Sequence, residues 1–145
     1  MIRPDTTGWK WVADHGNSRY FAPVDGVLAA VPHEGTIDTA ETARQNQDFQ
    51  HAYFEKLGRA GVIVIYFDLI KELNKDARTV YTQSDPRYLR GVALVGGTLL
   101  SRAMASFFMG IISPPPIPLK MFASTEDALS WARDLLARPT VEKTR

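Results

Sequence analysis

Residues 62–67, Val-Ile-Val-Ile-Tyr-Phe, place the strongest constraint on how this chain can fold. The run is β-branched and aromatic without a polar interruption, which is typical of a strand that is buried on both faces of its sheet. Helices must cover such a strand from both sides. The chain is therefore expected to combine a central sheet with helices on its two faces.

Strand and helix patterns alternate along the chain after a start made of strands alone. The predicted strands lie at residues 9–14, 19–23, 27–31, 62–67, 90–95 and 119–122. The predicted helices lie at residues 39–57, 74–82, 98–112 and 124–137. Asp25-Gly26 is a hairpin signal between two of the first strands. This order predicts an α/β fold with a mixed, mostly parallel sheet of about five to six strands, an antiparallel hairpin at its beginning and four helices.

Length and composition fit one domain. The chain has 145 residues, of which 45% are hydrophobic and 23% are charged. We expect a single domain over residues 1–145 with its core at about 9–137, a loose leader at 1–8 and a polar tail at 138–145. The beginning has no apolar stretch typical of a signal peptide, and no run is long and apolar enough for an integral membrane segment. We therefore expect a cytoplasmic protein.

Composition also argues against several classes of function. The chain contains no cysteine, which excludes a disulfide framework, thiol catalysis and cysteine-bound metal sites. The net charge is +1 and the arginines are scattered, so we expect no nucleic-acid partner.

Patterns for catalysis and for metal binding are weak. Asp48, His51 and Glu55 share one face of the helix predicted at 39–57, but that face carries further charges and is interpreted as solvated. The histidines lie far apart, and no zinc-protease, hydrolase-elbow or Walker phosphate-loop sequence occurs. We therefore expect no metal, no cofactor and no catalytic residue, although a triad that assembles only in space stays open.

Polar residues and glycines cluster where two predicted strands end. Asp68 ends the central strand, and Gly96-Gly97 lies between a strand and a helix, where free main-chain N–H groups would face outward. Ligands of open α/β sheets bind outside the carboxyl ends of the strands, so these residues and Asn74 should share one edge. The predicted partner- or ligand-binding residues are Asp68, Asn74, Asp76, Arg78, Gly96, Gly97, Thr98, Ser101 and Arg102. The alternative is a tight turn before a capped helix, with Asp68 accepting hydrogen bonds from loop N–H groups.

The helix predicted at 98–112 is apolar beyond what one small core needs. Most of its apolar stripe is expected to be core, and an exposed remainder would mark a homodimer or lipid contact. The residues of this possible apolar interface are Phe107, Phe108, Met109, Ile111 and Ile112.

Several of these segments together resemble a known family. They are the helix at 39–57, the strand ending in Asp68, the helix start Asn74–Arg78, the strand and turn Ala93–Thr98, and the closing stretch Leu119–Trp131. Over about residues 20–137 the chain resembles a STAS domain, of the bacterial type similar to sporulation anti-sigma-factor antagonists. The resemblance implies a binding module without enzymatic activity, often a regulator of another protein.

The resemblance departs from the family at one functional position. In the sporulation antagonists the helix after the central strand starts with a phosphorylatable serine, whereas the matching stretch here, Asn74-Lys75-Asp76-Ala77, has no serine or threonine. The phosphorylation switch is therefore not implied. A further hypothesis is that Asp76 supplies a constitutive negative charge at the start of this helix, where such a charge is favoured.

Three hypotheses follow for the function. The first is a regulatory protein-interaction module that binds a protein partner or a second copy of itself through the 74–82 helix, the 96–102 turn and the exposed part of the next helix. The second is a carrier or sensor of a small apolar ligand or lipid. The third is an enzyme that uses Asp68 as an acid or a base.

Overall fold

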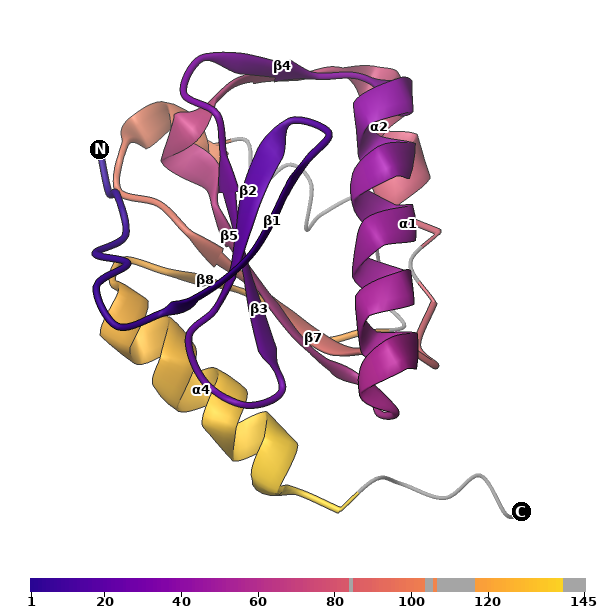
Figure 1. Ribbon diagram of the computed structural model, residues 1–145. Helices are drawn as coiled ribbons and strands as arrows, with labels where there is room; N and C mark the ends of the chain where they lie inside the picture. The colour runs from indigo at the N-terminus through magenta and orange to yellow at the C-terminus, as the bar shows by residue number, and fades with distance from the viewer. Residues whose placement is uncertain (84, 104–105, 107–116, 140–145) are drawn as a thin grey trace.

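The computed structural model describes residues 1–83, 85–103, 106 and 117–139. Six strands form one twisted sheet in the order β1-β2-β3-β5-β7-β8 (Figure 1). Their bounds are Lys10–His15 (β1), Ser18–Ala22 (β2), Val27–Pro32 (β3), Gly61–Tyr66 (β5), Leu89–Val95 (β7) and Leu119–Phe122 (β8). The β1-β2 and β2-β3 pairs are antiparallel, and the β3-β5, β5-β7 and β7-β8 pairs are parallel. The predicted mixed sheet with an antiparallel beginning is confirmed.

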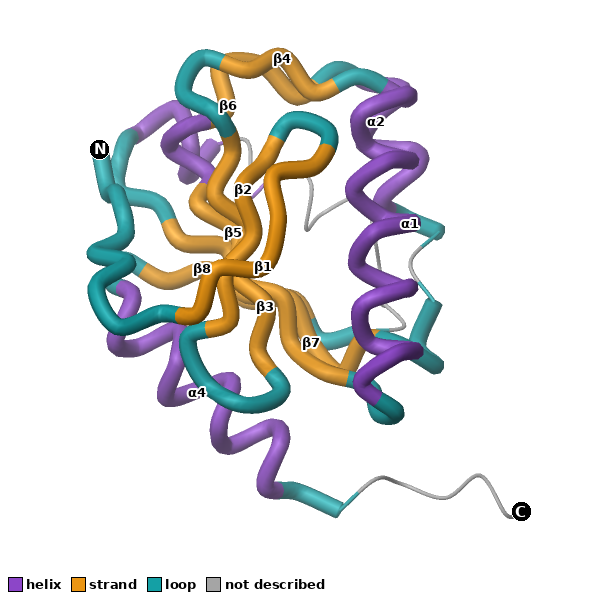
Figure 2. The backbone as a smooth tube through the Cα atoms, in the orientation of Figure 1, coloured by secondary structure: helices purple, strands orange, loops and turns teal. Residues whose placement is uncertain are grey.

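Helices cover both faces of this sheet. Helices α1 (Ala40–Leu57) and α2 (Lys75–Tyr81) lie on one face, and α4 (Thr125–Ala137) lies on the other (Figures 1 and 2). Residues 99–103 are also helical and begin the helix predicted at 98–112. None of the helices in the described part of the chain is long and apolar enough to span a membrane.

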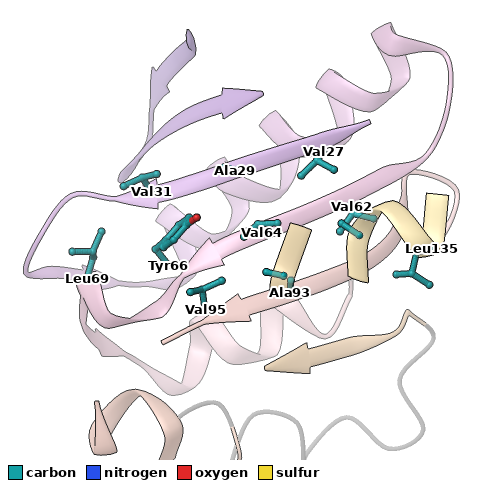
Figure 3. Close-up of a cluster of buried hydrophobic side chains, with 12 residues drawn as sticks. Val27, Ala29, Val31, Val62, Val64, Tyr66, Leu69, Ala93, Val95 and Leu135 are labelled. Carbon is teal, nitrogen blue, oxygen red and sulfur yellow. The ribbon is translucent and has the colours of Figure 1, made fainter. Parts of the chain in front are cut away.

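The side chains of β5 explain why this strand is apolar throughout. Val62, Val64 and Tyr66 join the buried cluster under α4, which Figure 3 shows, whereas Ile63 joins the cluster under α1. Successive side chains of a strand point to opposite faces, so a strand between two helical layers is apolar at every position. At Gly61, a Cβ atom would lie 2.2 Å from the Phe54 ring, so the close approach of α1 requires glycine there.

Local signals set the ends of the helices. Thr39 caps α1, Asn74 caps α2 and Ser124 caps α4, each through its side-chain oxygen. Helix α1 ends at Gly58, whose φ of 87° is left-handed. These ends agree with the predicted ones to within one or two residues.

A small second sheet was not predicted. Strand β4 (Thr36–Asp38) pairs in parallel with β6 (Ile70–Leu73), and the short 3-10 helix η1 (Phe67–Leu69) precedes β6. Both strands are too short to give a strand periodicity, and they pair across more than thirty intervening residues. Their local sequence therefore predicts only connections between the larger elements.

Candidate functional site

Asp68 is the centre of the predicted site. It lies in η1, directly after β5, and faces the turn Gly96-Gly97-Thr98 that follows the neighbouring strand β7. The two turns meet because β5 and β7 are parallel neighbours, which places their carboxyl ends side by side. This part of the prediction, the meeting of Asp68 with the glycine turn, agrees with the structure.

The Asp68 carboxylate accepts hydrogen bonds from the start of the chain and from the turn after β7. Gly97 N–H donates to Oδ2 at 2.9 Å and to Oδ1 at 3.1 Å, and the Thr98 N–H and hydroxyl each donate to Oδ1 at 3.2 Å. The Ile2 N–H donates to Oδ2 at 2.6 Å. Only 7% of Asp68 is exposed. The carboxylate therefore ties together three segments that are distant in the sequence.

This environment favours the ionised carboxylate. Burial raises the pKa of Asp68, but the hydrogen bonds from Ser101, Ile2, Gly97 and Thr98 together outweigh it and hold that pKa well below its ordinary value. The group stays charged at any physiological pH. Asp68 also accepts hydrogen bonds from the N–H groups of the turn, which were the proposed donors to an external anion. The arrangement is therefore that of the alternative prediction, a tight turn before a capped helix.

Two leucines lie on the surface next to this turn. Leu99 is 88% exposed and Leu100 is 62% exposed, whereas Ser101 is buried. Arg102 is exposed as well. The predicted apolar residues Phe107, Phe108, Met109, Ile111 and Ile112 lie outside the described residues.

Two of the residues predicted around α2, Asn74 and Arg78, form side-chain hydrogen bonds at the start of that helix. Strand β6 separates Asp68 from Asn74, a span of roughly 13 Å at the usual rise of a strand. The Asn74 side chain caps α2 by accepting from Ala77 N–H at 3.0 Å, and Arg78 donates to the carbonyl of Leu73 at 2.9 Å. Asn74 was expected at the same edge as Asp68, and the unpredicted strand β6 lies between these two residues in the chain.

A second polar cluster, which the sequence analysis missed, surrounds Asp38 at the end of β4. Asp38 is 2% exposed. Its carboxylate accepts from the Tyr81 hydroxyl at 2.7 Å, from the Thr42 hydroxyl, and from Asn17 Nδ2 at 3.3 Å. Its main-chain carbonyl accepts from Asn74 N–H at 3.1 Å. Asp38 therefore contacts both ends of α2 and fixes that helix against α1.

Buried amides of α1 extend this cluster. Asn46 Nδ2 donates to Asn17 Oδ1 at 2.8 Å and to the Tyr81 hydroxyl at 3.1 Å, and the Tyr20 hydroxyl donates to Asn46 Oδ1 at 2.8 Å. The sequence does carry a signal for this cluster. Asn46, Gln47 and Gln50 lie at helical spacing between the buried Ala43 and Phe54, so three amides occupy the inward face of α1.

The surroundings of Asp38 act on the pKa of its carboxyl group in two opposite directions. Burial raises the pKa of Asp38, while the hydrogen bonds from Thr42, Tyr81 and Asn17 oppose that change. None of the ion pairs within the described residues includes Asp38. The cavity beside it measures about 20 Å³, which is space for about one water molecule.

The charged face of α1 carries no assembled metal site. Asp48 and Glu55 are exposed, and the His51 ring stacks on Tyr88 with their centroids 5.0 Å apart. Within the described residues, no group of three or more His, Cys, Asp or Glu side chains is placed to hold a metal ion.

Comparison with known proteins identifies the fold and the family. The structure is similar to that of an uncharacterized protein from the DUF3478 family of Shewanella loihica PV-4, whose fold is described as SpoIIAA-like. The two share 18% identity with a TM-score of 0.57, over 83% of this chain and 97% of the other. This likeness confirms the STAS-like fold. No curated protein matches the chain. The family described as Domain of unknown function (DUF7793) matches residues 21–136, most of the chain, and the chain therefore belongs to the DUF7793 family.

Proposed function

We propose that this chain is a STAS-like protein-interaction module without enzymatic activity and without the phosphorylatable serine of the sporulation antagonists. Its contact surface is the Gly96-Gly97-Thr98 turn together with Leu99 and Leu100. The observation that carries this proposal is the exposure of the two adjacent leucines, at 88% and 62%, directly after a turn that a buried carboxylate holds in place.

The energetics of this surface fit a binding role. Full burial of a leucine side chain contributes about 1.5–3 kcal/mol, so the pair offers several kcal/mol to a partner. Asp68 fixes the turn before any partner arrives, and a contact made by a preorganised backbone loses less conformational entropy on binding. The leucines also lie at the carboxyl edge of the sheet, where open α/β folds bind their ligands.

The state of Asp68 argues for binding rather than catalysis. A general acid or base works best when its pKa lies near the ambient pH. The pKa of Asp68 is held well below its ordinary value by its donors, which also occupy its oxygens. Asp38, the other buried carboxylate, adjoins a cavity of about one water molecule and has no room beside it for a substrate.

Capture of partners tests the proposal. Tagged full-length protein is isolated from its native cells, and bound proteins are quantified by mass spectrometry for the wild type, Leu99→Ser/Leu100→Ser and the control Leu57→Ser. Leu57 is the matched control because it is an exposed leucine on α1, away from the turn. The double variant should lose at least about tenfold of a specific partner, and the control should keep it. Equal capture by all three proteins would refute the proposed surface.

Native mass spectrometry tests the carrier alternative. The protein purified without denaturation should show the mass of the chain, or of a simple multiple if a second copy is the partner. A stoichiometric added mass in the lipid range would overturn the interaction module and support a carrier instead.

A further inference from the structure

Residues 1–3 lie against the proposed contact surface in the manner of a bound peptide. Figure 1 shows the indigo start of the chain beside the segment that follows β7. The Ile2 N–H donates to Asp68 Oδ2 at 2.6 Å, and the Ile2 side chain packs against the core cluster under α4. The leader, which the sequence analysis expected to be loose, is thus attached at Ile2.

Gly97 provides the space for this side chain. A Cβ atom at position 97 would lie 3.1 Å from Ile2 Cδ1 and 3.2 Å from Ile2 Cγ1, closer than an ordinary contact. The lack of a side chain at Gly97 and the carboxylate of Asp68 together form what we call the Ile2 socket. It offers a carboxylate that accepts from a main-chain N–H group of a peptide, and an apolar depression for one side chain. Extended peptides use these two features when they bind.

Few interactions hold residues 1–3 in this place. Beyond Ile2, the Arg3 side chain forms an ion pair with Glu34, and both side chains are 56% exposed. Exposed ion pairs contribute little to stability. Met1 is largely exposed as well. A competing segment therefore has to replace mainly one hydrogen bond and one aliphatic side chain.

We propose that the Ile2 socket is a binding site for an extended peptide segment of a partner, with an aliphatic side chain in the place of Ile2 and its main-chain N–H on Asp68. Residues 1–3 occupy the socket in cis and so limit access to it. This inference rests on the proposed function, because Leu99 and Leu100 beside the socket would make the remaining contacts with the same partner.

Peptide binding in trans tests the socket. The probe is a fluorescent synthetic peptide of residues 1–8, titrated by anisotropy against full-length wild type and full-length Ile2→Asp. The aspartate should leave the socket, since it would face the Asp68 carboxylate. A site that is open for only part of the time binds more weakly by that fraction, so Ile2→Asp should bind the peptide about tenfold tighter than the wild type.

Two controls connect the binding to the socket. The same peptide with Ile2→Asp should not bind. The protein variant Ile2→Asp/Gly97→Ala should lose the peptide, because the added methyl group fills the socket while Asp68 keeps its donors. Absence of binding to Ile2→Asp, or equal binding with and without Gly97→Ala, would overturn the inference.

The two proposals fail separately. If Leu99→Ser/Leu100→Ser loses partner capture but the Ile2→Asp protein binds no peptide, the contact surface is supported and the socket is refuted. If the Ile2→Asp protein binds the peptide but the double variant captures partners as the wild type does, the socket is supported and the leucine surface is refuted.

Discussion

The variant Asp68→Asn should destabilise the protein because it removes the acceptor that joins three segments. Oδ1 serves Gly97 and Thr98, and Oδ2 serves Ile2 and Gly97. Whichever oxygen the amide nitrogen replaces, at least one buried N–H group then faces another donor. An unsatisfied buried donor costs about 1–3 kcal/mol, and the charge-assisted character of the other bonds is lost too.

We therefore expect a loss of about 3 kcal/mol in the free energy of unfolding at pH 7. For a chain of 145 residues this corresponds to a fall in Tm of roughly 6–12 °C. The assay is urea unfolding followed by circular dichroism. The control is Asp48→Asn on the exposed face of α1, which should change stability by less than about 0.5 kcal/mol.

The pH dependence gives a sharper test of the same reasoning. The pKa of Asp68 is lowered in the folded state, so its stabilisation is complete above the unfolded pKa of about 3.9 and is lost as the pH falls toward the folded pKa. The stability difference between wild type and Asp68→Asn should be constant from pH 7 to about pH 5 and shrink below that. Other groups titrate in both proteins and cancel in the difference. A difference that stays constant down to pH 3 would refute the ionised carboxylate as the anchor of the turn.

Three further variants examine the rest of the fold. Tyr81→Phe removes a donor from the buried Asp38 and should cost about 1–3 kcal/mol in urea unfolding, and an unchanged midpoint would contradict the role of that hydroxyl. Burial raises the pKa of Asp38, so its contribution is present below its unfolded pKa and lost as the pH rises through its folded pKa. Wild-type stability relative to Asp38→Asn should accordingly fall as the pH rises above about 4, and the opposite trend in urea unfolding would contradict this sign. Gly61→Ala would press a Cβ against the Phe54 ring and should cost about 2 kcal/mol or more in thermal unfolding. The control Gly35→Ala, in open space at a φ of 81°, should cost about 1 kcal/mol, and equal losses would argue against the close approach at position 61.

The attachment of Ile2 could not be read from the residues around it. Residues 1–8 have no periodicity, and their composition suggests a loose end. Ile2 finds its partners sixty-six residues away at Asp68 and further still at Gly97. Such contacts exist only once the sheet has brought the ends of β5 and β7 together.

The sequence by itself determined the fold class, the alternation of strands and helices, and where helices α1, α2 and α4 begin and end. The apolar run of β5, the caps Thr39, Asn74 and Ser124, and the turn at Gly26 are local signals, because each depends on neighbouring residues and on the periods of helix and strand. It also placed Asp68 beside the glycine turn, because the rule for parallel strands requires only their order.

Only the tertiary structure decided how the polar groups are used. It gave the donors of the turn to Asp68 rather than to an outside anion. It also gathered the cluster around Asp38 from β4, helices α1 and α2 and the first hairpin. It also inserted β6 between Asp68 and Asn74. A buried carboxylate takes whichever donors the packing of distant segments brings within about 3 Å, and no local pattern encodes that choice.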